Sequence, residues 1–416
     1  MISRSRHGER GQTILLVAMS IVSLLAMAAL AIDVVTLYTA RSEIQRAADA
    51  AALAGAKAFV DSGVTSDPTN TSLQTLAQSM STAFINATIA QNNIGGVPPV
   101  LVGSPAIDFT THPGNPQIAV TLQRTNLPIF FARIWSRTPA TVTASARAEA
   151  YNASNSQTNT GSLVKITPKC VKPLMVPNLN PNSSPPGLPY INVSSGLVAA
   201  GVVGADPSGL TVWHDGCPSG GGSTCGPPVV PPPYANGNYY FPAVVTANPA
   251  NLCPSCSGTS IFEQSIECCD FNPYSCGGTA PNASVDLVIA GNTLRQDVHR
   301  GLQCSMNMPT QDTLDASNFP TGPIEITAHS GPQSGKLVTT SSSIVTLPIF
   351  DNNTLNPATG QVTIIGFLQA FLWDFNGSSG NMQMTILNVV GCGNNPGAGP
   401  AISGGGASPI PVRLVH

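Results

Sequence analysis

A run of 20 uncharged residues, Thr13 to Ile32, restricts the fold of this chain more than any other feature. As a helix, the run TILLVAMSIVSLLAMAALAI measures about 30 Å, the thickness of the hydrocarbon core of a bilayer. Three arginines precede the run, and the first acid, Asp33, follows it. Since basic residues stay on the cytoplasmic side, we predict a single transmembrane helix at residues 13–32, a cytoplasmic tail at residues 1–12, and an extracytoplasmic remainder.

The same segment also has a feature of a cleavable signal peptide, because Ala29-Leu30-Ala31 has the A-x-A form that signal peptidase prefers. Two observations favour a retained anchor. The apolar run is longer than the usual signal core of about 7 to 15 residues. Helix-forming sequence without proline also continues through the cleavage site. We therefore predict one continuous helix from Thr13 to Phe59, about 70 Å long.

Composition excludes some functions and helps to locate the rest of the chain. Only 9% of the 416 residues are charged and the net charge is −3, so the chain has no basic field for nucleic acid. All ten cysteines come after residue 169, which indicates that this part matures in an oxidising compartment. We treat all of them as disulfide candidates and leave the pairing open. They are Cys170, Cys217, Cys225, Cys253, Cys256, Cys268, Cys269, Cys276, Cys304 and Cys392.

Two stripes of side chains run along the expected helix beyond the membrane. One stripe is made mostly of small residues, which allow another helix to approach closely. Its members are Leu37, Ala40, Ile44, Ala47, Ala51, Ala54 and Ala58. The other stripe is polar, and with the boundary residue Asp33 it gives the predicted contacts with partner helices: Asp33, Tyr38, Arg41, Gln45 and Asp49. The alternative is that alanine is simply a good helix former and that the charges form a solvated face.

The segment from Gly11 to Ala58 resembles the amino-terminal signature of the Tad (tight-adherence, Flp-type) pilus-assembly family, specifically its TadG-like members. The matching features are Gly11 and Gln12 at the start of the apolar run, then Asp33, Tyr38 and Arg41, and the block QRAADAAALAGA. A weaker resemblance to the strand-rich close of TadE/TadG-like domains covers residues 125–150.

This resemblance implies an inner-membrane protein related in architecture to type IVb pseudopilins, with a long helix that rises into an exported domain. The implied partners are other pilus-assembly proteins (TadE/TadF/TadG-like proteins and pilin) and membrane lipid, with no nucleic acid. Substrates of prepilin peptidase have Glu five residues after the Gly, whereas Leu16 stands at that position here. A permanently anchored protein is therefore favoured over a processed fibre subunit.

Beyond the long helix the sequence indicates an α+β fold followed by a mainly β region. Residues 73–87 have the apolar spacing of a second helix. Four segments are predicted to be strands: Val100–Phe109, Gln117–Gln123, Ile129–Trp135 and Ala140–Ala150. We expect a small pilin-like α+β domain, which includes the helix, over residues 33–151, a polar linker at 152–163, and a Cys/Pro/Gly-rich, disulfide-stapled β region over 164–416.

Three apolar segments of the last region predict an antiparallel meander, because turn-forming residues separate them. They are Ile344–Phe350, Gln361–Phe375 and Met382–Val390. Four aromatic residues of the middle segment are expected in the core, and by alternation the last three share one face: Phe367, Phe371, Trp373 and Phe375. The segment 397–412 near the end of the chain is expected to be loose.

The sequence contains no pattern that predicts an enzyme. Cys253 and Cys256 have the spacing of a redox motif, but their Pro/Ser/Gly-rich surroundings favour structural disulfides. The sequence SGPQSGK, which ends at Lys336, lacks the first glycine and the Ser or Thr of a phosphate loop, so we expect a hairpin loop there. No second pair of cysteines and no pair of histidines has the spacing of zinc ligands. We expect no metal, cofactor or catalytic residue.

These observations favour a membrane-anchored, non-enzymatic component of a Tad/Flp-type pilus-assembly or secretion apparatus, whose helix packs with pseudopilin-like helices. Two alternatives come from other classes. One is a cell-surface adhesin or envelope-structural protein that uses the same anchor helix. The other is an exported redox or hydrolytic enzyme, which free thiols at Cys253 or Cys256 would support.

Overall fold

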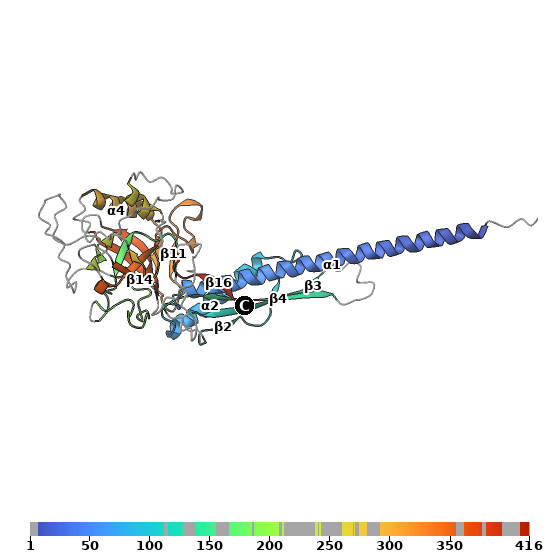
Figure 1. Ribbon diagram of the computed structural model, residues 1–416, viewed down its shortest axis with the longest axis horizontal. Coiled ribbons are helices and arrows are strands. Elements are labelled where there is room, and N and C mark those ends of the chain that lie inside the picture. Colours follow the sequence, from blue (N-terminus) through green and yellow to red (C-terminus); the bar gives the residue numbers. More distant parts are fainter. Residues whose placement is uncertain are drawn as a thin grey trace, which may run out of the picture.

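The fold is α+β, with one very long helix that projects from a body of antiparallel sheets (Figure 1). This computed structural model describes residues 7–111, 115–127, 139–154, 166–184, 187–207, 210–211, 238–239, 241–242, 260–268, 270, 274–280, 292–354, 362–376, 380–392 and 408–415. A proximal part packs along the second half of the long helix, and a rounded distal part caps its carboxyl end. The predicted fold class is therefore confirmed.

The long helix, α1, runs without a break from His7 to Asp61, which confirms the prediction of a single rod. It ends where Gly63 takes the left-handed conformation, with φ +73°, and donates its N–H to the carbonyl of Val60 at 3.0 Å. Glycine is favoured at this position after a helix because it has no Cβ to clash there. The apolar run and the alanine-rich stretch are thus two halves of one element.

The predicted second helix is also confirmed, as α2, Thr71–Gln91. Asn70 caps its first turn, because its side-chain oxygen accepts from the amides of Ser72 and Leu73. The helix returns along α1, and the Ser81 hydroxyl donates to the carbonyl of Gly55 at 2.9 Å. A Cβ on Gly55 would approach side chains of both α2 and the sheet within about 3 Å, so this glycine permits close three-way packing.

The proximal sheet lies beside α1 and has the order β1-β3-β4-β16, with β2 also paired to β3. Its strands are β1 (Val100–Leu101), β2 (Ala106–Asp108), β3 (Gln117–Leu127), β4 (Ala140–Ala150) and β16 (Val412–Val415). The expected single strand at Val100–Phe109 is divided into β1 and β2. The expected strand Ile129–Trp135 lies outside the described residues.

Alternation along β3 decides which face of this sheet is buried. Ile118, Val120 and Leu122 are buried in the core that contains the alanines of α1. The residues between them face outward, where Thr121 pairs with Ser145 through their hydroxyls at 2.9 Å. The sheet is therefore apolar toward the helix and polar on its outer face, as is common for an antiparallel sheet.

The chain returns to the proximal sheet at its end, where β16 pairs with the last four residues of β4. The Arg413 side chain donates to Glu149 Oε1 at 2.6 Å, and the amide of Tyr151 donates to the carbonyl of Pro411 at 2.9 Å. Ile410 is buried in the proximal core. The expectation of a loose segment over 397–412 is therefore wrong for its last residues, while 397–407 lie outside the described residues.

The distal part is built on a six-stranded sheet with the order β15-β14-β13-β5-β8, to which β9 adds by pairing with β14. The strands are β5 (Leu174–Pro177), β8 (Phe241–Pro242), β9 (Thr279–Ala280), β13 (Ile344–Phe350), β14 (Val362–Phe375) and β15 (Met382–Gly391). Strands β13, β14 and β15 form the predicted antiparallel meander.

Smaller elements complete the distal part. The helices are α3 (Ile261–Glu267) and α4 (Asn292–Ser305), with short 3-10 turns at Gly331–Gln333 and Asn352–Thr354. The remaining strands are β6 (Leu210–Thr211), β7 (Asn238–Tyr239), β10 (Thr313–Asp315), β11 (Glu325–Thr327) and β12 (Leu337–Val338). The segment SGPQSGK joins the antiparallel strands β11 and β12, which confirms that it is a hairpin loop.

The prediction for the aromatic residues of β14 is wrong at Trp373, which is 40% exposed, whereas Phe367, Phe371 and Phe375 are buried. The register explains the error. Leu372 pairs with Met384 and Asp374 pairs with Gln383, which leaves Trp373 as the extra residue of a β-bulge. A bulge inserts one residue and breaks the alternation of faces.

Candidate assembly surface

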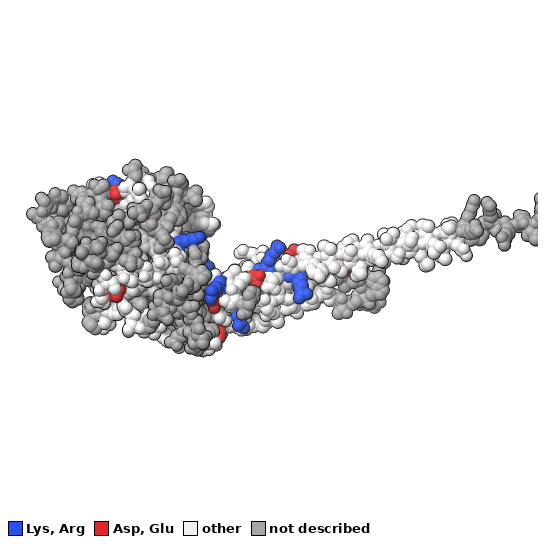
Figure 2. Space-filling view, viewed as in Figure 1, with Lys and Arg blue, Asp and Glu red and all other residues white. Residues whose placement is uncertain are grey.

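Most of the described side chains in the first half of α1 are exposed, and Ala29 and Asp33 are buried. Of the helices that the structure describes, α1 is the one long and apolar enough to cross a membrane. Its large apolar side chains are exposed from Ile14 to Leu30, and Figure 2 shows no charge on this bare stretch where it is described. A helix that is apolar all round and unpacked in water has the properties of a membrane segment.

Polar side chains in this stretch satisfy themselves within the helix. The Ser20 hydroxyl donates to the carbonyl of Val17 at 2.8 Å, and the Ser23 hydroxyl donates to the carbonyl of Ser20 at 2.9 Å. In hydrocarbon no water is available to bond these groups, so local bonds of this kind lower the cost of burying a hydroxyl. The bare stretch is therefore compatible with lipid along its whole length.

The small-residue stripe packs inside the chain. Ala40, Ile44, Ala47 and Ala51 are all buried in the proximal core, against α2 and the inner face of the sheet. The absence of large side chains lets the sheet and α2 approach the α1 backbone. Beyond the bare stretch, this face is therefore not available to a helix of another protein, contrary to the use that we expected from the sequence.

The five residues predicted to contact partner helices occupy different environments. Asp33 is only 2% exposed, although it lies on an otherwise bare helix. Tyr38 is 74% exposed and Arg41 is also exposed. Gln45 donates to Asp49 Oδ1 at 2.9 Å and to the carbonyl of Ser145 at 3.4 Å. Of the five, Tyr38 and Arg41 point most freely toward a possible partner.

A buried polar junction joins the proximal part to the distal part. The Ser66 hydroxyl bonds to both backbone groups of Val389 in β15, and Asn152 Nδ2 donates to the carbonyls of Thr65 and Val389 at 3.1 and 3.0 Å. Ser66 and Asn152 are both buried. Asn152 is the first residue of the expected linker, so the chain is held firmly where the linker was expected to begin.

Sequence reasoning missed this junction. Ser66 lies in a turn-like stretch and Asn152 in a polar one, and both patterns are typical of exposed loops. The sequence signal that could have found this contact is Gly63, three residues before Ser66, because a glycine allows another segment to approach closely. A Cβ on Gly63 would lie 2.5 Å from the side chain of Val203 in the distal part.

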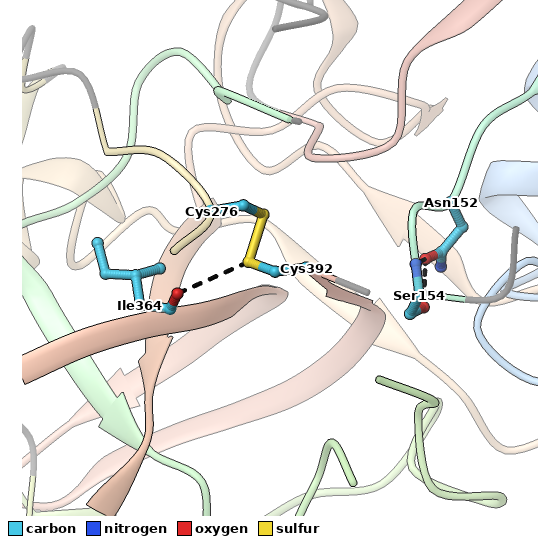
Figure 3. Close-up of a disulfide and its surroundings, with 5 residues drawn as sticks. All are labelled: Asn152, Ser154, Cys276, Ile364 and Cys392. Atoms are coloured by element: carbon cyan, nitrogen blue, oxygen red, sulfur yellow. Dashed lines mark hydrogen bonds between the residues drawn. A yellow bond between two sulfur atoms is a disulfide. The ribbon is translucent and has the colours of Figure 1, made fainter. Parts of the chain in front are cut away.

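A disulfide joins Cys276 to Cys392, with Cα atoms 5.1 Å apart and a sequence separation of 116 (Figure 3). Cys392 directly follows β15, the strand that holds Val389. The bond therefore ties the segment before β9 to the strand that meets the proximal part. Cys170, Cys268 and Cys304 are also disulfide-bonded, and the other five cysteines, CPSC included, lie outside the described residues.

One lysine is buried completely beneath α3. The Lys172 ammonium donates to the carbonyls of Ile266, Glu267 and Cys268 at the carboxyl end of that helix. Burial lowers the pKa of Lys172 to about 7, against the attraction of Glu267. Burial and the neighbouring carboxylate of Glu263 raise the pKa of Glu267 to about 7. Lysine at a helix carboxyl end satisfies carbonyls that have no partner in the helix.

The acids near this lysine belong to an ion cluster that joins α3 to α4. Arg300 binds both carboxylate oxygens of Glu263, at 3.0 and 2.9 Å, and Asp297 Oδ1 at 2.8 Å. Ser260 donates to the other oxygen of Asp297 at 2.6 Å. Within the part of the chain that the structure describes, no three side chains of His, Cys, Asp or Glu are grouped as metal ligands would be.

Comparison with known proteins points to the same segment as the geometry. Residues 11–58 match the family titled "Putative Flp pilus-assembly TadE/G-like". No curated protein and no solved structure matches the chain. The amino-terminal helix is thus a TadE/G-like segment, as the resemblance predicted, and the match lies almost entirely within α1.

Proposed function

We propose that this protein is a non-enzymatic, single-pass component of a Tad/Flp-type pilus-assembly or secretion apparatus in the inner membrane, with both parts outside the cytoplasm. The observation that carries the proposal is the coincidence of the family match with α1. The matched residues, 11–58, include both the bare apolar stretch and the half of the helix that supports the proximal part.

The bare stretch of α1 is the surface proposed to meet pseudopilin-like helices. Its exposed apolar side chains include Leu24 and Leu25, each about two thirds exposed. In a bilayer, helices associate by packing and by contacts of small residues rather than by the hydrophobic effect. Ser23, Ala26 and Ala28 supply small side chains beside these leucines. Other Tad pilus-assembly proteins, TadE-like proteins and pilin among them, are the proposed partners.

A crosslinking experiment tests this assignment directly. A photoreactive residue at Leu24 in the full chain should crosslink in living cells to pilin or to a TadE-like protein. The matched control places the same residue at Leu337, which is similarly exposed but lies in the distal part. Equal crosslinking to these partners from both positions would contradict a role for the bare helix.

Deletion provides the functional test. Cells that lack this protein should lose assembled pili in the sheared surface fraction, and the unaltered chain should restore them. The chain lacks Glu at the position of Leu16, so its electrophoretic mobility should not depend on prepilin peptidase. Normal numbers of pili in the deletion strain would refute the proposed function.

A cell-surface adhesin or envelope-structural protein is the second candidate. It is favoured by the distal part, which has its own core and at least one disulfide and a sequence that is poor in charge and rich in Gly and Pro. Protease added to intact cells distinguishes the two candidates. Cleavage of the distal part in intact cells favours the adhesin, and protection until the outer membrane is opened favours the assembly component.

A further inference from the structure

The outward surface of α1 remains apolar beyond the residue where the sequence places the membrane boundary. Asp33 is 2% exposed, whereas Val35, two residues later, is 63% exposed. The carboxylate therefore does not interrupt the surface that lipid would meet. The first exposed charged side chain after the apolar run is that of Arg41, and the exposed Tyr38 comes just before it. Tyrosine is enriched where a helix leaves the hydrocarbon, so the boundary moves toward Val35.

The proximal sheet provides a measure of height above the bilayer. The contact between Gln45 and the carbonyl of Ser145 places these two residues at the same level. Strand β4 runs alongside α1 (Figure 1) and begins five residues nearer the membrane, at Ala140. At about 3.3 Å per residue these strand residues cover about 16 Å, which equals about 11 residues of helix. Ala140 is therefore about level with Val34.

The edge strand β1 presents apolar side chains close to this end. Val100 pairs with Gln123 of β3, two residues nearer the membrane than the level of Ser145. It therefore lies about 7 Å below Ser145, level with Arg41. Val100 is 56% exposed, and Val97 before it is exposed as well. These valines form an apolar edge on a sheet whose outer face is otherwise polar, about 10 Å farther from the membrane than Ala140.

Contacts with α1 and β3 fix the height of this edge. The amide of Gly95 donates to Glu43 Oε2 at 3.1 Å, and Arg124 Nε donates to the carbonyl of Ile94 at 3.2 Å. The loop before β1 is thus held to both elements. Among the charged side chains of α1 near this level, that of Arg41 is exposed.

We propose that the membrane-facing end of the proximal part rests in the phospholipid headgroup layer, which Tyr38 and Arg41 contact from α1 and Val97 and Val100 contact from the edge of β1. The occupant is lipid because a bilayer extends as a plane across the helix axis and meets every side chain at this height, whichever side of the helix it is on. Val100 lies about 9 Å above Val35. The headgroup layer extends about 5 to 7 Å beyond the hydrocarbon, so the backbone of Val100 lies about 2 to 4 Å outside this layer and the valine side chain meets its outer surface, while the longer side chain of Arg41 extends into it.

The inference rests on the membrane anchoring of α1 and not on a role in pilus assembly. It also explains why Asp33 is buried within the protein, because a carboxylate that faces lipid at the hydrocarbon edge is energetically costly. Contact with headgroups combines exposed apolar side chains with a basic one, which is the composition of segments that lie on membrane surfaces.

Quenching of tryptophan fluorescence by lipid tests the proposal. The full chain carrying Val100→Trp is reconstituted in vesicles of phosphatidylcholine and phosphatidylglycerol that contain a lipid with a nitroxide on its headgroup. The matched control is Leu337→Trp, an equally exposed position in the distal part, and the unaltered chain gives the background of its three native tryptophans. We expect severalfold stronger quenching of the added tryptophan at residue 100 than at residue 337.

Equal and weak quenching at the two positions would overturn the proposal. Val97→Trp, at the other exposed valine of the proposed contact, replaces Val100→Trp if that variant does not fold. Flotation of the same samples with the vesicles reports membrane anchoring separately. A chain that floats but shows no difference in quenching therefore refutes the headgroup contact while the anchor itself stands.

Discussion

The Ser66 hydroxyl bonds to both backbone groups of Val389, accepting from its amide and donating to its carbonyl, each at 3.0 Å. Ser66 lies just after the end of α1, and Val389 lies in the distal strand β15. The hydroxyl of Ser66 therefore satisfies the two backbone groups of Val389 that a neighbouring strand would otherwise bind, because β15 is an edge strand of the distal sheet. This contact couples the orientation of the distal part to that of the long helix.

Removing this hydroxyl should loosen the junction. Ser66→Ala leaves the buried amide of Val389 without its acceptor, which should lower the free energy of unfolding by about 1 to 3 kcal/mol. Ser194→Ala is the control, because the hydroxyl of Ser194 makes an exposed bond to Asn192. Denaturant unfolding of the detergent-solubilised chain measures both variants. Similar losses in the two would contradict a special role for Ser66.

A methyl group at Gly63 should be more harmful than one at Gly96. Both glycines have positive φ, +73° and +86°, so each substitution carries backbone strain of about 1 to 2 kcal/mol. At Gly63 the new Cβ would also lie 2.5 Å from Val203, whereas nothing lies within 4 Å at Gly96. Thermal unfolding should therefore show a clearly lower midpoint for Gly63→Ala. Equal midpoints would mean that the two parts separate easily at this contact.

The disulfide should stabilise the distal part through the long loop that it closes. Cys276 and Cys392 are separated by 116 residues, so Cys276→Ala/Cys392→Ala should cost about 3 to 5 kcal/mol by restoring entropy to the unfolded chain. Calorimetry under non-reducing conditions measures the change. A variant with serine at both positions should lose as much stability as the double alanine variant if the covalent link is responsible. An unfolding temperature equal to that of the unaltered chain would show that the link contributes little.

The buried ammonium of Lys172 should make stability depend on pH. Its pKa is about 7 in the folded protein and 10.5 without burial, so between these values the unfolded chain binds more protons than the native one. Stability should therefore rise with pH across this window, by at most about 1.4 kcal/mol per pH unit.

Replacing the lysine tests that origin. Lys172→Met removes the proton-binding group and should flatten the rise above pH 7, as measured by denaturant unfolding at a series of pH values. The pKa of Glu267 is raised from 4.5 to about 7, so this residue lowers stability as the pH rises from 4.5 to 7. Above pH 7 it contributes no further change. A rise above pH 7 that persists unchanged in Lys172→Met would exclude the lysine as its source.

The elements governed by local pattern could be predicted from the sequence. The charge-free length predicted the apolar first half of α1, the alanine content predicted its continuation, and period-two alternation predicted β4, whose bounds Ala140–Ala150 agree with the prediction. The meander followed from turn residues between apolar runs. Each of these signals lies within a short window of sequence, where helix and strand periods are directly visible.

The surfaces of the helix could not be predicted in the same way. The alanine stripe looks identical whether its partner is a foreign helix or a sheet of the same chain, and only the fold shows that Ala47 and Ala51 are buried internally. Asp33 was predicted to contact a partner helix, and only the fold shows that it is 2% exposed within this chain. Trp373 was wrongly predicted to be in the core. A β-bulge is defined by the pairing with the neighbouring strand, and the alternation of residues within β14 contains no information about that pairing.

The pairing of β16 with β4 makes the whole distal part an insertion between two neighbouring strands of one small sheet. During synthesis, β4 leaves the ribosome roughly 260 residues before its partner strand does. The edge of β4 therefore stays unpaired while the whole distal part is made. A stop codon near residue 400 would leave α1, α2 and every distal strand in place, yet the unpaired edge of β4 would be exposed to aggregation and to quality-control proteases.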